Sequence, residues 1–394
     1  MCHLSKKSTF PFTAIAVLSG VLLAFSLVRD LSAMSSNSGW RQSNISGFGT
    51  SQNSAISALA NLGNQMYAGT WNDNGAQVWR TRDGQTWSQV TPTWSISNIE
   101  VQDAESFGTY LYVGTGREGG GEIWRTNGTT WEQVASGGLG DSNNYGFNAF
   151  AVFSNALYVA TANIPPAIGG TGNGVEIWRS KTGNAGSWVQ VNSDGFGAGP
   201  TWPDVTMEIY EGHLYVGLSR PVGKSGGIAE LWRTDNGTTW TAVFTDGLGS
   251  PDNTHASAMA GFKGDFYIGL RNSTTGGEVW RSSDGMNWTA ALTGGLGDVA
   301  NSRPYGLIVF NDQLYLVFSN VDTGAEVWQT GDGVSWRQIS AGGWGDSNNG
   351  FADYFDKGAV VFNQALYIGT VNNVDGGEIW QRLHQLYLPL VLKN

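Results

Sequence analysis

Residues 276–292 read GGEVWRSSDGMNWTAAL, and close variants of this stretch recur along most of the 394-residue chain. A tyrosine segment such as FYIGL (266–270) precedes each copy, and an apolar segment such as YGLIVF (305–310) precedes the tyrosine. A further short segment, here NWTAA, follows the Asp-Gly turn. Each repeat therefore contains four short segments typical of β-strands. The repeat is marked by seven tryptophans at positions 79, 124, 178, 232, 280, 328 and 380.

Four antiparallel strands in a repeat of 45 to 54 residues are typical of a β-propeller blade, with a solenoid as the alternative. The two ends of the repeat region favour the propeller. The seventh repeat stops at Gln381-Arg382 without an outer strand, whereas GWRQSNISGFG (39–49) matches the outer-strand segment SWRQISAGGWG (335–345). Because an unpaired strand edge is unfavourable, the N-terminal segment is expected to complete the last blade. The sequence predicts an all-β fold, a seven-bladed β-propeller over residues 38–382 closed by its own N-terminal strand.

The Asp284-Gly285 turn falls between the third and fourth strands of the fifth repeat. Asp or Asn can accept hydrogen bonds from the backbone that follows it, and Gly tolerates positive φ, so the pair suits a tight hairpin. Trp288 is expected to pack between blades. The same turn occurs at residues 83–84, 127–128, 236–237 and 332–333. This pattern resembles the Asp-box, or BNR, repeat of sialidases and related secreted bacterial propellers. In those proteins the turn is remote from the active site, so the resemblance implies a structural role.

The N-terminal residues have the order of a secretory signal peptide. Lys6 and Lys7 precede an apolar run over residues 13–28, and Leu31-Ser32-Ala33 offers a cleavage site, so residues 1–33 are predicted to be removed. An uncleaved N-terminal anchor is the alternative. Residues 383–394 form a hydrophobic C-terminal tail that is either a sorting or anchoring element or a strand packed under the propeller.

Charge and composition limit the partners. The net charge of −11 becomes −13 without residues 1–33, and an acidic protein repels nucleic acid and anionic membranes. Cys2 is the single cysteine, so the mature chain has neither disulfides nor thiolate metal sites. We predict a secreted or cell-surface monomer without a cofactor, a bound metal or a membrane-spanning segment in the mature chain.

Residues just before or at the start of the apolar strands vary from repeat to repeat. Variation at equivalent positions indicates a ligand site at the channel mouth, because a purely structural role could be filled by the same residue in every repeat. Aromatic rings for stacking together with Asp and Arg for hydrogen bonds are typical of sugar binding; the lining of a wet channel is the alternative. The candidates are Tyr145, Trp202, Asp204, His255, Arg303, Tyr305, Asp356 and Lys357.

Three further arginines belong to the loops that follow the tyrosine strands: Arg117, Arg220 and Arg271. With Arg303 they could hold a carboxylate by paired hydrogen bonds, as the arginine cluster of sialidases does. Loop arginines paired with local acidic residues are the alternative. The chain also departs from sialidases, which have six blades and an Arg-Ile-Pro signature that is absent here.

The linkers between repeats raise one more possibility. Sequences such as GLGDSNN (138–144) place Asp141, Asp298 and Asp346 beside asparagine, and oxygen ligands suit calcium. Ser and Thr occupy the same place in other linkers, which favours a turn capped by a side chain.

These observations favour a secreted, non-catalytic propeller that binds carbohydrate or an extracellular partner through the channel mouth. A sialidase-like glycoside hydrolase is the alternative, with Asp204 and either Asp356 or Glu208 as the carboxylate pair. A third class is a protein-interaction scaffold.

Overall fold

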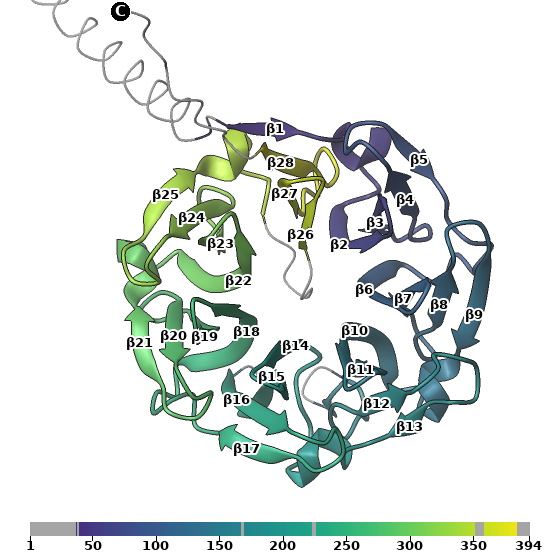
Figure 1. The fold of residues 1–394 in the computed structure, drawn as a ribbon, viewed down its shortest axis with the longest axis horizontal. Helices are drawn as coiled ribbons and strands as arrows, with labels where there is room; N and C mark the ends of the chain where they lie inside the picture. Colours follow the sequence, from purple (N-terminus) through teal and green to yellow (C-terminus); the bar gives the residue numbers. More distant parts are fainter. Residues whose placement is uncertain (1–36, 38, 167–168, 223–225, 351–357, 384–394) are drawn as a thin grey trace, which may run out of the picture.

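The computed structural model describes residues 37, 39–166, 169–222, 226–350 and 358–383. These residues form strands, turns and short 3₁₀ segments, with no α-helix among them, so the predicted all-β class is confirmed. Figure 1 shows the sheets arranged around a central axis, which is the arrangement of a β-propeller. Within the described ranges no helix is long and apolar enough to cross a membrane.

Each repeat contributes its strands in the order that the sequence predicts, from the inside of the ring to the outside. The first three repeats contain β2 (Ala55–Leu62), β3 (Gln65–Trp71), β4 (Val78–Thr81), β5 (Trp87–Gln89), β6 (Glu100–Phe107), β7 (Tyr110–Gly116), β8 (Ile123–Thr126), β9 (Trp131–Ala135), β10 (Asn144–Phe153), β11 (Ala156–Asn163), β12 (Ile177–Ser180) and β13 (Val189–Gln190). The fourth and fifth contain β14 (Val205–Tyr210), β15 (His213–Val222), β16 (Gly226–Thr234), β17 (Thr241–Phe244), β18 (Asn253–Phe262), β19 (Asp265–Asn272), β20 (Glu278–Ser282) and β21 (Thr289–Leu292). The last two contain β22 (Asn301–Phe310), β23 (Gln313–Asn320), β24 (Glu326–Thr330), β25 (Arg337–Ser340), β26 (Ala359–Phe362), β27 (Ala365–Gly369) and β28 (Ile379–Leu383).

The strands of each repeat pair antiparallel with their neighbours in sequence. The fourth, fifth and sixth repeats each form a separate four-stranded sheet. The first three repeats join into one sheet of 12 strands, but single residue pairs, Trp71 with Glu100 and Gly116 with Gly146, are the links between them. Both links lie where an inner strand begins, so neighbouring sheets touch there.

The N-terminal segment completes the sheet of the last repeat, as the sequence predicts. Strand β1 (Trp40–Gln42) pairs antiparallel with β28, with Trp40 opposite Arg382. Beyond the strand, the Asn44 side chain accepts a hydrogen bond from the Ile379 amide at 2.7 Å. Trp40 packs edge-on against Trp344 of the sixth repeat, with ring centroids 5.5 Å apart. The two ends of the repeat region are thus held together by backbone and side-chain contacts.

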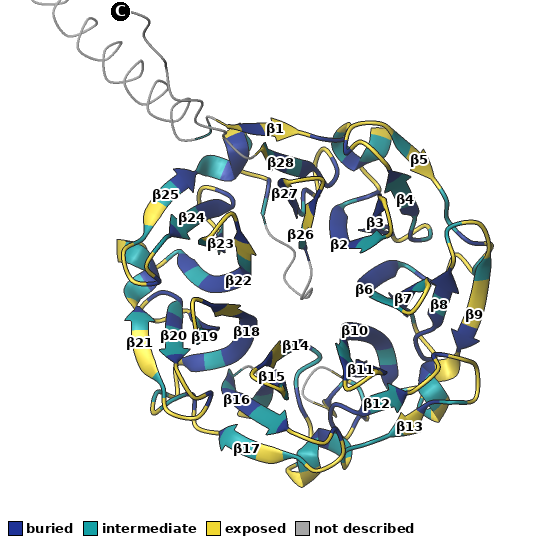
Figure 2. Ribbon diagram, viewed as in Figure 1, coloured by how far each residue is buried: buried dark blue, intermediate teal, exposed yellow. Residues whose placement is uncertain are grey.

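The hydrophobic core lies between adjacent sheets. The tyrosine of every repeat is buried, and Tyr215 shares a cluster with Phe266 and Ile268 of the next repeat. Removing a large apolar side chain from water stabilises the fold by about 2 kcal/mol, so each sheet depends on its neighbours. Figure 2 shows the result: burial is concentrated on the inner strands, and exposed residues gather on the outer strands and hairpins.

The Asp-Gly turn holds this packing in place. The Asp284 carboxylate accepts hydrogen bonds from the backbone amides of Met286 and Asn287, both at 2.8 Å, and these bonds hold its pKa below the usual range. Gly285 has φ +68°, and a Cβ there would lie 1.9 Å from the Tyr215 hydroxyl oxygen of the preceding repeat. Trp288 packs against Phe244 between the two sheets. The turn is therefore a structural element.

The linker aspartates cap turns as well. Asp298 accepts hydrogen bonds from the Ala300 amide and the Asn320 side chain, both at 2.9 Å. The neighbouring Asn301 donates to the Gly295 carbonyl and to Glu326. No group of three potential metal-ligating side chains occurs within the described ranges. The hydrogen bonds favour the turn interpretation over calcium.

Candidate functional site

Six of the candidates lie at or just before the first residues of the inner strands, and Figure 1 shows these strands around the axis: Tyr145, Trp202, Asp204, His255, Arg303 and Tyr305. Tyr145 belongs to β10, Asp204 directly precedes β14, His255 belongs to β18, and Arg303 and Tyr305 belong to β22. Asp356 and Lys357 lie outside the described residues. The inner strands thus bring residues from separate repeats to one end of the channel.

Asp204, His255 and Arg303 form one buried cluster, although the first and last are 99 residues apart. Arg303 donates a hydrogen bond from Nη1 to Asp204 Oδ2 at 3.0 Å, and His255 Nε2 lies 3.6 Å from the same oxygen. All three residues are more than nine-tenths buried. The Arg303 guanidinium also lies over the Tyr305 ring, 4.6 Å from its centroid, in cation–π geometry. Three repeats therefore combine an anion, a cation, an imidazole and an aromatic face.

The surroundings keep His255 neutral. Burial lowers the pKa of His255 well below 6.5, and the positive charges of Arg303 and Arg271 lower it further. The 3.6 Å approach to Asp204 is therefore a contact of a carboxylate with a neutral ring, and not an ion pair. A neutral imidazole has one donor and one acceptor nitrogen, and here Nδ1 lies within hydrogen-bond distance of Thr254 Oγ1, at 3.0 Å.

The remaining candidates differ in their surroundings. Arg117 pairs with Glu122 at 2.6 Å, and Arg220 pairs with Glu230 at 2.5 Å, each within its own hairpin. Both contacts match the alternative interpretation, in which the loop arginines pair with acidic residues close by in the sequence. In contrast, the Arg271 guanidinium has no hydrogen-bond or ion-pair partner among the described residues, and β19 places Arg271 opposite His255.

Trp202 lies next to the cluster in sequence, two residues before Asp204. Its indole Nε1 donates to the Gly226 carbonyl at 3.2 Å, which fixes the ring beside the strand that follows the loop of the fourth repeat. The ring is only partly buried. Trp202 therefore offers a fixed and accessible aromatic surface near the mouth.

A second polar group on the second and third repeats was not predicted. Glu100, at the start of β6, accepts a hydrogen bond from Gln102 at 2.8 Å, and burial raises the pKa of Glu100 to about 7. Burial and the charge of Glu100 also raise the pKa of Tyr145. A Cβ at Gly116 would lie 2.7 Å from both Glu100 Oε2 and a Tyr145 ring carbon, so glycine leaves room for the two side chains to approach.

A signal for Glu100 does exist in the sequence. The segment EVQDAESF (100–107) aligns with the other inner strands on its final Phe107, which places Glu100 among the variable residues at the strand starts. Extending the alignment of the inner strands to the second repeat would have found it.

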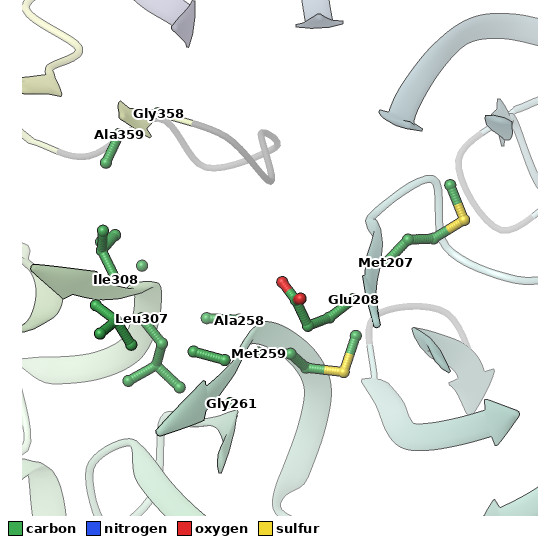
Figure 3. Close-up of a pocket in the computed structure, with 12 residues that line it drawn as sticks. Met207, Glu208, Ala258, Met259, Gly261, Leu307, Ile308, Gly358 and Ala359 are labelled. Carbon is green, nitrogen blue, oxygen red and sulfur yellow. The ribbon is translucent and has the colours of Figure 1, made fainter. Parts of the chain in front are cut away.

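Further along the inner strands, residues of β14, β18, β22 and the start of β26 line a cavity of about 320 Å³. The side chains that line it are mainly apolar and include Met207, Met259 and Leu307. Figure 3 shows the Glu208 carboxylate projecting from β14 into this space. Glu208 is the only charged residue among those that line it. The cavity thus places one carboxylate among apolar side chains, and none of Asp204, His255 and Arg303 lines it.

The comparisons with known proteins agree with this fold. No protein-family model and no curated protein sequence matches the chain. Among solved structures it is similar to virginiamycin B lyase from Staphylococcus aureus, at 7% identity and a TM-score of 0.58 over 87% of this chain and 98% of that one. It is also similar to polysaccharide lyase Uly1, at 9% identity and a TM-score of 0.54 over 82% of this chain and 89% of that one.

A sialidase from Trypanosoma rangeli shares 14% identity over 87% of this chain and 59% of its own, with a TM-score of 0.48. The identities to the two lyases are also low, so those similarities concern the fold alone.

Proposed function

We propose that this chain is a secreted, seven-bladed propeller that binds carbohydrate at the channel mouth without reacting with it. The blade count is supported by the strand pairing: three four-stranded units within the 12-stranded sheet and four separate four-stranded sheets. In this proposal residues 1–33 direct secretion, residues 38–382 are the propeller with its Asp-box turns, and residues 383–394 are a tail.

The cluster of Asp204, His255 and Arg303 carries the proposal. Burying a carboxylate and a guanidinium costs desolvation free energy, and apolar residues of similar size often give equal or greater stability. The repeat does not require these residues, because the second and third repeats have Glu100 and Tyr145 near the same place. A role in binding accounts for a buried ionic cluster that the fold does not need.

The chemistry of the cluster fits a sugar. A pyranose presents hydroxyl groups that both donate and accept hydrogen bonds, and it presents C–H faces that stack on aromatic rings. Asp204 supplies an acceptor and Arg303 supplies donors, while His255 Nδ1 lies 3.0 Å from Thr254 Oγ1, which leaves Nε2 of the neutral ring for the ligand. The partly buried Trp202 supplies an aromatic face at the same end of the channel, whereas Tyr305 is buried and its ring supports the Arg303 guanidinium. The similarity in fold to a polysaccharide lyase is consistent with a saccharide ligand.

A glycan array probed with residues 34–394 tests the proposal. We expect specific binding that is lost in Trp202→Ala and Arg303→Gln, and the same signal with and without calcium. Arg337→Gln, an exposed substitution on the outer strand β25, is the control and should bind as the original chain does. A blank array with a folded protein would contradict the proposal and favour an extracellular protein partner.

A glycoside hydrolase is the second candidate, and one observation favours it. A general acid must be protonated at the working pH, and the Glu100 carboxyl, with a pKa of about 7, meets that condition. Asp204 and Glu208 are the described carboxylates that could assist. If aryl glycosides are turned over by the protein and not by Glu100→Gln, the hydrolase replaces the binding proposal; no turnover by either form is expected.

A further inference from the structure

A groove on the outer rim, between the third and fourth repeats, is a separate feature from the channel mouth. It has a volume of about 580 Å³, within the range of small-molecule sites. One wall is formed by β13 and the linker that follows it, and the other by Trp232 and the hairpin that ends at Trp240. Figure 1 shows β13 and β16 on adjacent sheets of the ring.

The third repeat differs from the others at this groove. Its outer strand β13 contains only two residues, whereas the other outer strands contain three to five. The hairpin before it, TGNAGSW (182–188), replaces the Asp-Gly or Asn-Gly turn found at the corresponding place in the neighbouring repeats. Because the strand is short, the side chains behind it are not covered by a regular outer edge.

Arg179 is the one charged residue among those that line the groove, and it is only partly buried. The equivalent arginines of other repeats are bonded: Arg80 donates to the Gly128 carbonyl at 2.7 Å, and Arg233 donates to the Tyr215 hydroxyl at 3.4 Å. Among the described residues, no hydrogen-bond or ion-pair partner is found for the Arg179 guanidinium. A cation without a partner in an acidic protein favours an anionic ligand.

The rest of the lining has the chemistry of a sugar site. Trp240 is fixed, because its Nε1 donates to the Val191 carbonyl at 2.9 Å and Phe196 packs against it edge-on, with ring centroids 5.4 Å apart. A fixed indole loses little freedom when a sugar ring stacks on it. The exposed Thr238 and Thr239 add hydroxyl groups at the opening.

We infer that this rim groove is a second carbohydrate-binding site, and that it takes a sugar unit bearing an anionic group. Arg179 holds the anion by paired hydrogen bonds while the sugar ring lies on Trp240. A carboxylate and a sulfate ester share this chemistry, and two probes separate them. The site is separate from the channel mouth, since its residues belong to the third strands β12 and β16, the outer strand β13, the linker after it and the hairpin that ends at Trp240, and none belongs to an inner strand.

Titration calorimetry with three tetrasaccharides tests the inference: tetragalacturonate for carboxylates, a carrageenan tetrasaccharide for sulfates, and cellotetraose as the neutral probe. The protein used is residues 34–394 carrying Trp202→Ala, so that mouth binding is weakened while the buried Asp204–Arg303 pair stays intact. We expect at least one anionic probe to bind, and Arg179→Gln to weaken that binding about ten- to hundredfold, the loss of a charge-assisted pair. The neutral probe should bind much more weakly.

Arg233→Gln is the matched control, because Arg233 holds the same repeat position but already has a hydrogen-bond partner. It should leave the affinity unchanged, and Arg179→Lys should restore part of it. The inference is overturned if neither anionic probe binds at millimolar concentration, if Arg179→Gln binds normally, or if Arg233→Gln causes an equal loss in a protein with an unchanged melting temperature. Failure of the mouth proposal would appear instead on the array, where Arg303→Gln and the original chain would behave alike.

Discussion

At the residue scale, position in the ring sets the protonation of each polar group. His255 and Glu100 occupy similar places on inner strands, and burial drives both toward their neutral forms. Asp204 instead has the Arg303 guanidinium at 3.0 Å. One end of the channel therefore combines a neutral imidazole, a carboxyl that titrates near neutrality and a carboxylate beside a cation. Such a mixture offers hydrogen bonds of both kinds to a ligand.

Glu100 should make stability depend on pH. Its pKa is about 7 in the folded chain against 4.5 for an ordinary glutamate, so the unfolded chain loses its proton first as the pH rises. The free energy of unfolding should therefore fall between pH 4.5 and 7, by at most about 3 kcal/mol. This fall in the free energy of unfolding should be absent from Glu100→Gln, because glutamine does not titrate. Urea unfolding of both forms at pH 5 and pH 8 measures the difference, and parallel pH profiles would contradict the assignment.

Replacing only one member of the Asp204–Arg303 pair should lower the free energy of unfolding. Asp204→Asn leaves the buried Arg303 without its anion, and we expect a loss of about 3–5 kcal/mol in the free energy of unfolding. Arg303→Gln in the same chain should recover part of that loss, because the unpaired charge is then gone. A double-mutant cycle by urea unfolding measures the coupling. Additive effects of the two substitutions would show that the pair does not act as a unit.

At the scale of the strand and the turn, the Asp-Gly hairpin depends on the tyrosine below it. Gly285→Ala places a Cβ 1.9 Å from the Tyr215 hydroxyl at φ +68°, whereas Gly264 has φ +83° and open space around the same position. Gly264→Ala should therefore lose only the backbone term of about 1–2 kcal/mol, and Gly285→Ala clearly more. Thermal melts of the two variants give the comparison. Equal losses would mean that the close contact with Tyr215 does not constrain the hairpin.

The elements show what the sequence could predict. Strand order and turns depend on neighbours within a few residues, so the spacing of tyrosine, tryptophan and Asp-Gly was sufficient to place them. The N-terminal strand was also predictable, because GWRQSNISGFG repeats a pattern seen elsewhere in the chain.

The side-chain partners were less predictable. The distance between Asp204 and Arg303 depends on the packing of three sheets, and nothing local in the sequence encodes it. The pairing of Arg117 with Glu122 was foreseen only as an alternative, because a five-residue separation across a hairpin permits the contact without requiring it.

At the scale of the whole molecule, the stability of each sheet in the ring depends on the other sheets. Each sheet buries its faces against two neighbours. The outer strand of the last sheet is β1, which comes from the N-terminal end of the repeat region. Strand β1 covers the edge of β28, and Trp40 fills the space beside Trp344. Loss of β1 would expose a strand edge and part of the core together.

Deletion of residues 38–45 from the 34–394 chain should therefore lower the melting temperature markedly, because the pairing with β28 and the Asn44 hydrogen bonds are lost together. Gln42→Ala, an exposed substitution on β1, is the control and should change little. A synthetic peptide of residues 37–50 added to the deleted chain should bind the open edge and restore part of the stability. Calorimetric melts with and without the peptide measure both effects. If the deleted chain melts like the full one, the N-terminal strand is not what holds the ring closed.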